Sequence, residues 1–310
     1  MTLPPASSSR LVRRTPLIEA RFVGDGVWLK LESLQRTGSF KLRGAVSACA
    51  SLTADERRRG IVVASAGNHG AGMALAASAA SISLTVVVPR GTPETKLAKI
   101  RGAGGLVHIF DGDYDGADAF ARKMADDRDA VFVSAFDDER VIAGNGDSLA
   151  VEIAAQRADV ATVVLPVGGG GMIAGVARTL APGGVEVIGA QPQNNCAMHD
   201  SLKCGRALTD YAGEHTIAEG CEGAVGALAF SIAKDHIASV ALVSEDEIEA
   251  AVRAAYHELG LVIECSGAVG LAALMAGLVP LSKGPLVCVI SGGNIDESEL
   301  DRILCHRPRL

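Results

Sequence analysis

The sequence predicts an α/β protein with parallel or mixed sheets flanked by helices. Short apolar runs bounded by turn residues indicate buried strands, and helical patterns of roughly ten residues separate them. This alternation favours parallel pairing, because parallel strands need long crossover connections. The runs that we interpret as strands span residues 26–32, 61–64, 83–89, 105–110, 131–133, 163–167, 185–190 and 286–290.

The composition suits a globular chain of about two domains. The chain has 310 residues, of which 48% are hydrophobic and only 4% aromatic, so Ala, Val, Leu and Ile must fill the core. We expect residues 1–47 and 143–310 to form a large domain that carries the main ligand-binding loops, and residues 48–142 to form a smaller α/β domain inserted into it.

Charge and cysteine content exclude several classes of protein. The net charge is −7 and no basic run is present, which argues against nucleic acid as a partner. Residues 1–14 lack the apolar core of a signal peptide, and no apolar stretch reaches membrane-spanning length. The seven cysteines form no C-x-x-C pair and the seven histidines show no close ligand spacing. We therefore expect a reduced, cytoplasmic protein without structural zinc, bound to neither membrane nor nucleic acid.

The strand at residues 26–32 leads into a helical pattern that begins near Lys41. Thr37 or Ser39 could cap this helix, which would place Lys41 in its first turn. A cation there opposes the positive end of the helix dipole. That position disfavours the ammonium and favours a neutral, nucleophilic amine, which forms a Schiff base with an aldehyde.

Two glycine-rich loops each join a predicted strand to a helix. Ser65, Ala66, Gly67, Asn68 and His69 follow the strand at residues 61–64. The free N–H groups of a helix start suit a carboxylate, although such a segment alone is more often an ordinary connection.

The second loop follows the strand at residues 163–167. Its glycines let the backbone approach a phosphate. The loop lacks the lysine of a P-loop and the G-x-G-x-x-G spacing, which favours a small monophosphate over a nucleotide. It consists of Gly168, Gly169, Gly170, Gly171 and Met172.

These segments together resemble one family. The motif Ser39-Phe40-Lys41-x-Arg43-Gly44-Ala45 is similar to the lysine motif of the fold-type-II pyridoxal-phosphate enzymes, which are tryptophan synthase beta-like. The match is closest to the serine/threonine dehydratase (ammonia-lyase) branch, which is related to serine racemase. The two glycine-rich loops and the segment that begins at Ser291 agree in identity and order, so the resemblance covers nearly the whole chain.

The resemblance implies pyridoxal 5'-phosphate as cofactor, joined to Lys41 beside Phe40. It implies that the loop at residues 168–172 holds the phosphate, Asn68 bonds the phenolic oxygen and Ser291 bonds the pyridine nitrogen. The substrate carboxylate would dock on residues 65–69. Asn145, Glu219 and Glu264 become possible cleft residues, although Glu219 serves equally well as a plain surface carboxylate.

Two departures from the family pattern affect metal and substrate. Asn145 and Asp147 stand where the family usually has Gln and Thr, so Asp147 would add a carboxylate near the site entrance. Racemase-like members carry two carboxylates for a divalent cation where this chain has Gln191 and Ala197. An amide and a methyl group are poor ligands for Mg²⁺ or Ca²⁺, so we predict no metal at that position.

The expected activity is elimination from a β-hydroxy amino acid. The Ser291 hydroxyl is a neutral partner for the ring nitrogen and leaves the ring a weak electron sink, which favours β-elimination over transamination. We expect L-threonine or L-serine to yield a 2-oxo acid and ammonia in amino-acid catabolism, in a homodimer as is usual in the family. The alternatives are a serine or hydroxyaspartate racemase, a β-replacing synthase, and a non-catalytic cofactor-binding or ligand-sensing protein. Racemisation ranks lower because Ala66 stands where racemases have a serine as proton donor.

Overall fold

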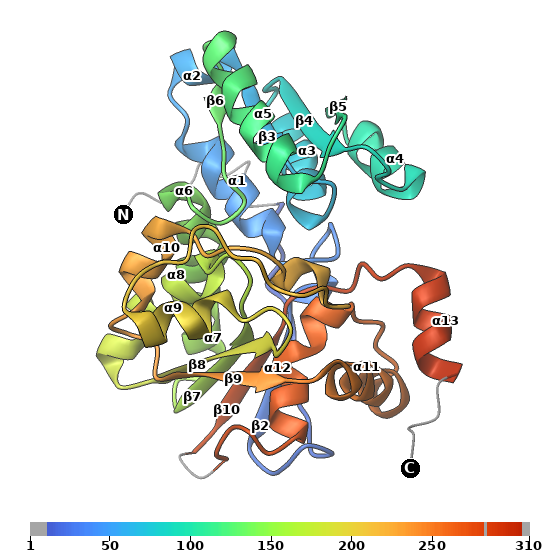
Figure 1. Cartoon of the computed structure of the whole chain (residues 1–310). Coiled ribbons are helices and arrows are strands. Elements are labelled where there is room, and N and C mark those ends of the chain that lie inside the picture. The colour runs from blue at the N-terminus through green and yellow to red at the C-terminus, as the bar shows by residue number, and fades with distance from the viewer. Residues whose placement is uncertain (1–10, 282–283, 306–310) are drawn as a thin grey trace. The chain divides into compact units, whose positions relative to one another are not determined.

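The computed structural model describes residues 11–281 and 284–305. The chain divides into two compact units: unit 1 comprises Met1–Arg13 and Gln35–Asn145, and unit 2 comprises Arg14–Leu34 and Gly146–Leu310 (Figure 1). From the sequence we predicted domain boundaries after residues 47 and 142. The roles assigned to the two domains stay predictions. Residues 1–10 lie outside the described part of the chain. They belong to residues 1–14, in which we expect no signal peptide.

Unit 1 contains a four-stranded sheet in the order β5-β4-β3-β6, with every neighbouring pair parallel. Its strands are β3 (Ile61–Ala64), β4 (Leu84–Pro89), β5 (Leu106–Phe110) and β6 (Val131–Phe132). Its helices are α1 (Lys41–Ser51), α2 (Ala54–Arg59), α3 (Asn68–Ala79), α4 (Glu94–Gly102), α5 (Tyr114–Asp127) and α6 (Glu139–Ile142), and a π-helical turn, Ala143–Asp147, follows.

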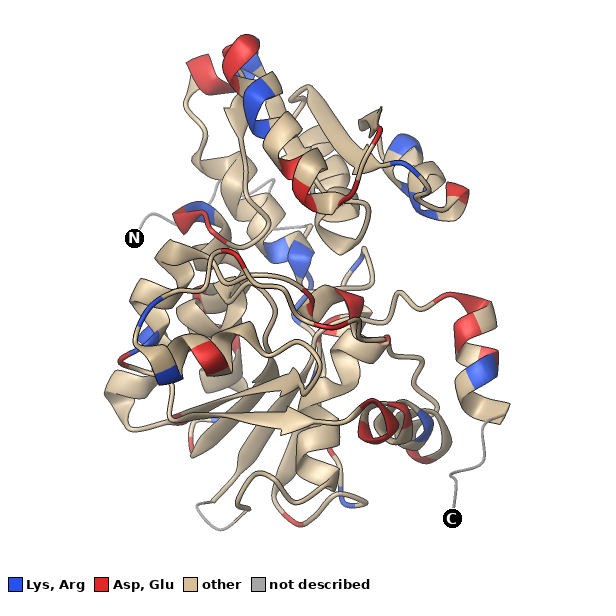
Figure 2. Cartoon of the chain, in the orientation of Figure 1, with Lys and Arg blue, Asp and Glu red and all other residues tan. Residues whose placement is uncertain are grey.

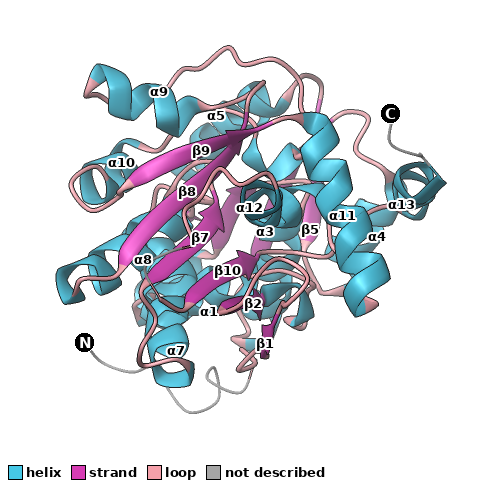
Figure 3. Ribbon diagram, turned by 90° about the horizontal axis from the view of Figure 1, so that it is seen from below, coloured by secondary structure: helices cyan, strands magenta, loops and turns pink. Residues whose placement is uncertain are grey.

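Unit 2 contains a six-stranded sheet in the order β1-β2-β10-β7-β8-β9, whose strands lie side by side in Figure 3. Only β1 is antiparallel to its neighbour. The strands are β1 (Leu17–Glu19), β2 (Val27–Leu31), β7 (Thr162–Pro166), β8 (Glu186–Pro192), β9 (Ser239–Val243) and β10 (Leu286–Ile290). The helices are α7 (Ser148–Gln156), α8 (Gly171–Leu180), α9 (Ala197–Cys204), α10 (Ala227–Ala233), α11 (Glu245–Leu259), α12 (Cys265–Met275) and α13 (Glu297–Cys305).

The predicted α/β fold is confirmed, and so is the aliphatic core. Alternate residues of the central strands, such as Val164 and Cys288, pack into one apolar cluster with α11 and α12. Charged residues are frequent along helices such as α2, α5, α11 and α13 (Figure 2). Within the described residues, no helix combines the length and hydropathy needed to cross a membrane.

The structure corrects the prediction of how helix α1 begins. Its N-cap residue is Phe40, and no side chain caps it. The Ser39 hydroxyl is buried and hydrogen-bonds to no described residue. Neither Thr37 nor Ser39 therefore supplies the cap, because the chain already turns helically at Phe40.

A buried lysine of unit 2 links three segments that lie far apart in the sequence: the chain before β1, strand β2 and helix α7. Lys30 on β2 is fully buried. Its ammonium donates to the Thr15 carbonyl at 2.8 Å and to Gln156 Oε1 at 2.7 Å, and it pairs with the Glu152 carboxylate. A buried charge is tolerated only when its hydrogen bonds are met in this way. The contacts fix the segment before β1 and β2 itself against α7.

Replacing Lys30 with Met is expected to destabilise unit 2 by up to about 3 kcal/mol, because the largely covered Glu152 carboxylate, 15% exposed, then loses its cation. Urea unfolding followed by the fluorescence of Trp28, the only tryptophan in the sequence, measures the change on the same strand. Removing both charges in Lys30→Met/Glu152→Leu should recover part of the loss. The exposed Lys203→Met variant is the control, and equal unfolding midpoints for all variants would contradict the expectation.

Candidate active site

Lys41 is the first residue of α1, as predicted. Its side chain is half-buried, its ammonium donates to the Ala135 carbonyl at 2.9 Å, and it lies 5.2 Å from the centroid of the Phe40 ring. On α3, a Cβ added to Gly72 would lie 3.3 Å from the Lys41 carbonyl oxygen, so glycine permits the two helices to approach closely. Ala135 was missed from the sequence because a backbone carbonyl leaves no residue-type signal.

Asn145 holds the helix that carries Lys41. The Asn145 side chain is buried, and its Oδ1 accepts from the Gly44 amide at 2.8 Å. A Cβ at Gly44 would lie only 2.6 Å from this oxygen, so the bond requires glycine there. Asn145 therefore orients α1 three residues beyond Lys41, and any contact with substrate stays a prediction.

Asp147 is tied to a neighbouring helix of unit 2. Its carboxylate accepts from Arg178 Nε at 2.8 Å and Nη2 at 2.7 Å, and from the Thr179 hydroxyl at 3.2 Å. Such a two-pronged pair fixes both side chains. We expected Asp147 to add a carboxylate near the site entrance; Arg178 on α8 neutralises that carboxylate.

The loop between β3 and α3 has the geometry of an anion site. Its chain is fixed by the Gly67 amide, which donates to Ser65 Oγ at 3.2 Å, and by Gly70, where a Cβ would meet the Ser65 carbonyl at 2.4 Å. The first intrahelical bond of α3 runs from the Ala71 amide to Gly67. The amides of Asn68, His69 and Gly70 thus precede it and have no acceptor within the helix.

His69 contributes an uncharged ring to this loop. The Nε2 atom contacts the Val133 carbonyl at 3.4 Å, and because a carbonyl only accepts, Nε2 carries the proton. The Nδ1 atom is buried and hydrogen-bonds to no described residue. Burial, with Lys41 as a second cause, lowers the pKa of His69 to about 3. The neutral imidazole gives no positive charge for a carboxylate, so His69 could serve there only through its backbone amide.

In unit 2, the second glycine-rich loop turns from β7 into α8. Gly170 adopts φ +90°, the left-handed region, and is the N-cap of α8. A Cβ at Gly168 would lie 2.4 Å from the Gly220 carbonyl, so a side chain there cannot fit without movement of the backbone. The first amides of α8, among them Gly171 and Met172, face a glycine-lined turn. Such an arrangement can accommodate a phosphate, and the phosphate role of this loop stays a prediction.

Ser291 lies at the same edge of the sheet as this loop. Strands β10 and β7 are parallel, with Leu286 opposite Thr162, so Ser291 and Gly168 both follow their strands at the carboxyl ends. The Ser291 residue is 4% exposed at this edge. A serine hydroxyl can both donate to and accept from a ligand atom.

Two further predicted segments converge on the same edge. The Gly220 amide, in the short helix Glu219–Cys221, donates to Ser266 Oγ at 2.8 Å. The Glu264 amide donates to the Gly292 carbonyl at 3.1 Å, directly after Ser291. Unit 2 thus brings the glycine loop, Ser291, Glu219 and Glu264 together through backbone contacts. Ser266 was missed, since a single serine in a helix carries no distinctive pattern.

Gln191, which stands in place of a family metal ligand, uses both ends of its amide. Its Nε2 donates to the Val167 carbonyl at 3.2 Å, and its Oε1 accepts from the His199 amide at 3.0 Å. The side chain is fully buried. Gln191 therefore joins β7 to α9 by hydrogen bonds, and the predicted lack of an Mg²⁺ or Ca²⁺ site here stays a prediction.

Acid is expected to destabilise unit 1 through His69. The pKa of His69 is lowered from 6.5 to about 3 by burial, so between these values the unfolded chain binds a proton that the folded chain does not. Stability is fully present above about pH 6.5 and falls as the pH drops. Urea unfolding followed by circular dichroism at about pH 7 and pH 5 should show a smaller loss in His69→Gln than in the wild type. Equal losses in both proteins would contradict this.

Comparison with known proteins shows the family of this chain. The chain matches a family model described as pyridoxal-phosphate dependent enzyme over residues 8–292. It is 41% identical to the L-threonine ammonia-lyase of Thermotoga maritima over 302 residues, 95% of this chain and 74% of that protein. It is 34% identical to the catabolic L-threonine dehydratase TdcB of Staphylococcus aureus strain USA300 over 97% of this chain and 90% of that protein.

Solved structures give the same result. The processed threonine deaminase isoform 2 of Solanum lycopersicum superposes with a TM-score of 0.91 and 31% identity, covering 98% of this chain and 91% of that one. Maize serine racemase superposes with a TM-score of 0.89 and 26% identity, covering 96% and 93%. Because the family model matches most of this chain, the chain belongs to the pyridoxal-phosphate dependent enzymes of fold type II, in the group that includes the serine and threonine dehydratases.

Proposed function

We propose that the protein is a threonine and serine ammonia-lyase, which converts L-threonine or L-serine to a 2-oxo acid and ammonia by β-elimination. The observation that carries this proposal is Lys41 at the start of α1, in a chain 41% identical to an L-threonine ammonia-lyase. A small amino acid is then the substrate. A homodimer in the cytoplasm is the assembly and location that we propose by analogy with the family.

The residues present suit pyridoxal phosphate. In unit 2, the glycine-lined turn at residues 168–172 offers amides for the phosphate, and the Ser291 hydroxyl suits the pyridine nitrogen. In unit 1, Lys41 would hold the aldehyde carbon, with Phe40 beside it, and Asn68 at the start of α3 would bond the phenolic oxygen. When bound, the cofactor supplies the electron sink that stabilises negative charge at the substrate Cα.

Lys41 has two roles in this proposal. It anchors the cofactor at rest, and its amine becomes free when the substrate amine takes its place. The free amine then accepts the Cα proton as general base. The same nitrogen, now protonated, can return a proton to the departing β-hydroxyl, which leaves as water. The unsaturated amine that results takes up one water and yields the 2-oxo acid and ammonia, so no net water is consumed.

The loop at residues 65–69 orients the substrate. The first amides of α3 can donate to the substrate carboxylate, and the positive end of the helix dipole adds attraction. The His69 ring is neutral because its pKa is lowered, so it adds no charge to this loop. Asn145 supports the same arrangement indirectly, since its bond to Gly44 fixes α1 and thereby the backbone of Lys41.

Racemisation is the closest alternative, and structures of serine racemases are among the similar folds. It needs a proton donor on the opposite face of Cα, and Ala66 offers only a methyl group where racemases of the family have a serine. Hydroxyaspartate and other β-hydroxy amino acids remain within the proposed substrate class. A cofactor-binding protein without activity is the alternative from outside catalysis.

The test is a 2-oxo acid assay over a panel of L- and D-β-hydroxy amino acids, with chiral analysis of the remaining substrate. Lys41→Ala is expected to lower kcat by at least about 100-fold, because the general base is lost. Borohydride treatment of the wild type should label Lys41 and leave the variant unlabelled. Lys123→Ala, in an exposed pair with Asp127, is the control and should keep full activity. Chiral inversion without 2-oxo acid would favour the racemase instead.

Replacing Gly170 with Ala is expected to weaken cofactor binding roughly tenfold. A left-handed φ costs a residue with a Cβ about 1–2 kcal/mol, and the added carbon would lie 2.8 Å from Met198 Cε, so the loop must shift. Fluorescence titration of the apoenzyme with pyridoxal phosphate measures the affinity. Gly183→Ala, whose Cβ would meet no atom within 4 Å, should bind as the wild type does. Unchanged affinity in Gly170→Ala would argue against the phosphate role.

A further inference from the structure

A cluster of three different metal-binding side chains lies at the start of α9. Cys196, His199 and Asp200 have the spacing i, i+3 and i+4, which places them on one face of a helix. One ligand atom from each lies within 4.8 Å of the other two. His199 Nδ1 is 3.2 Å from Asp200 Oδ1, and Cys196 Sγ is 3.7 Å from Asp200 Oδ2.

Neighbouring groups hold the cluster in position. Gln191 Oε1 accepts from the His199 amide at 3.0 Å, and the Asp200 amide donates to the Cys196 carbonyl at 3.1 Å. The Tyr211 hydroxyl donates to Asp200 Oδ2 at 2.9 Å and lies 3.5 Å from Cys196 Sγ. Hydrogen bonds to a ligating carboxylate are typical of metal sites, where they fix the orientation of the ligand.

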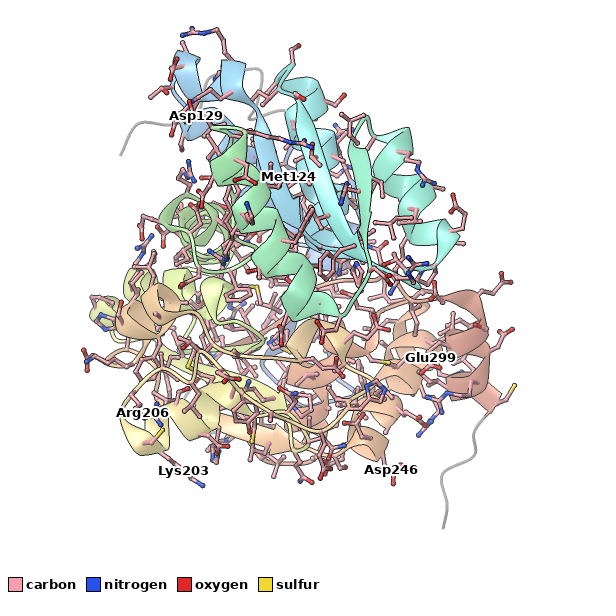
Figure 4. All side chains as sticks on the ribbon, turned by 45° about the horizontal axis from the view of Figure 1, so that its top comes forward. Met124, Asp129, Lys203, Arg206, Asp246 and Glu299 are labelled. Atoms are coloured by element: carbon pink, nitrogen blue, oxygen red, sulfur yellow. The ribbon has the colours of Figure 1, made fainter. Side chains whose placement is uncertain are left out.

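The ligand set selects the kind of metal. A thiolate and an imidazole suit Zn²⁺ and similar transition metals, whereas Mg²⁺ and Ca²⁺ prefer oxygen alone. The thiolate and the carboxylate balance the charge of a divalent ion. The Asp200 carboxylate lies in the first turn of α9, where the helix dipole stabilises it. The last turn of this helix and the residues after it carry the cations Lys203 and Arg206 (Figure 4).

We propose that Cys196, His199 and Asp200 form a binding site for Zn²⁺ or a similar transition-metal ion, with a fourth position open to water. Binding replaces the thiol proton of Cys196, which passes to solvent. The site adjoins the position of the family's carboxylate pair, which corresponds here to Gln191 and Ala197, but uses three other side chains. We expected no structural zinc because the chain has no C-x-x-C pair and no clustered histidines, and a mixed C-x-x-H-D pattern falls outside both.

The site also adjoins the proposed phosphate loop. Met198, between two of the ligands, carries the Cε atom that lies 2.8 Å from the Cβ position of Gly170. A metal on the first turn of α9 would therefore stiffen the helix that packs against this loop. The binding site itself does not depend on the proposed activity.

Cobalt(II) is the probe, because its d–d bands lie in the red, where the yellow cofactor does not absorb. Untagged holoenzyme with the exposed thiols removed by Cys204→Ser and Cys305→Ser is titrated with Co²⁺. We expect one equivalent to give intense bands of tetrahedral type that Zn²⁺ abolishes and Mg²⁺ leaves unchanged. The absence of such bands would overturn the proposal.

Variants assign the ligands. Cys196→Ser and His199→Ala should each lose the bands, and Tyr211→Phe should bind Co²⁺ about 10–100-fold more weakly, as expected for a supporting hydrogen bond. His215→Ala, which removes an exposed histidine paired with Glu222, is the control and should bind normally. Binding that survives Cys196→Ser would refute the site. The 2-oxo acid assay on the same samples reports separately on the proposed activity.

Discussion

Parallel pairing of β2, β10, β7 and β8 is the constraint on which the described arrangement of unit 2 depends. Since these strands run in one direction, their carboxyl ends meet at one edge of the sheet, and the residues that follow each strand lie at that edge. Ser291, the glycine loop and Gln191 reach this edge from three distant parts of the sequence. Binding sites of open α/β sheets form at such edges.

Close backbone approach is the second condition, and glycine supplies it. Gly168 lies against Gly220, and Gly267 lies against Gly292, each with no room for a Cβ. The edge of the sheet is thus lined by main-chain amides and carbonyls more than by side chains. Rigid backbone donors of this kind are well suited to hold a phosphate, because they need no reorganisation when the ligand arrives.

The fold class and eight strands could be predicted from the sequence because apolar runs and glycine turns are local signals, but the short β1 and the half-exposed β9 were missed. Lys41, the glycine loop and Ser291 could be singled out because their motifs are contiguous, and their roles stay predictions. The sequence could not reveal that Asn145 accepts from Gly44, that Arg178 neutralises Asp147, or that the Ala135 carbonyl receives the Lys41 amine. Each of these depends on contacts between residues far apart in the chain, and the last involves no side chain of the acceptor. The capping prediction at Thr37 and Ser39 was wrong because Phe40 is already helical.

The bond between Asn145 and Gly44 has an evolutionary consequence. The amide side chain occupies the volume that any β-carbon at position 44 would need, so the two positions can only change jointly. If a shorter side chain replaced Asn145, alanine could occupy position 44. The helix α1 would then gain intrinsic helix propensity but lose the hydrogen bond that fixes its position. Among related sequences, the pair should therefore covary, and drift at either position would signal relaxed selection on the placement of α1.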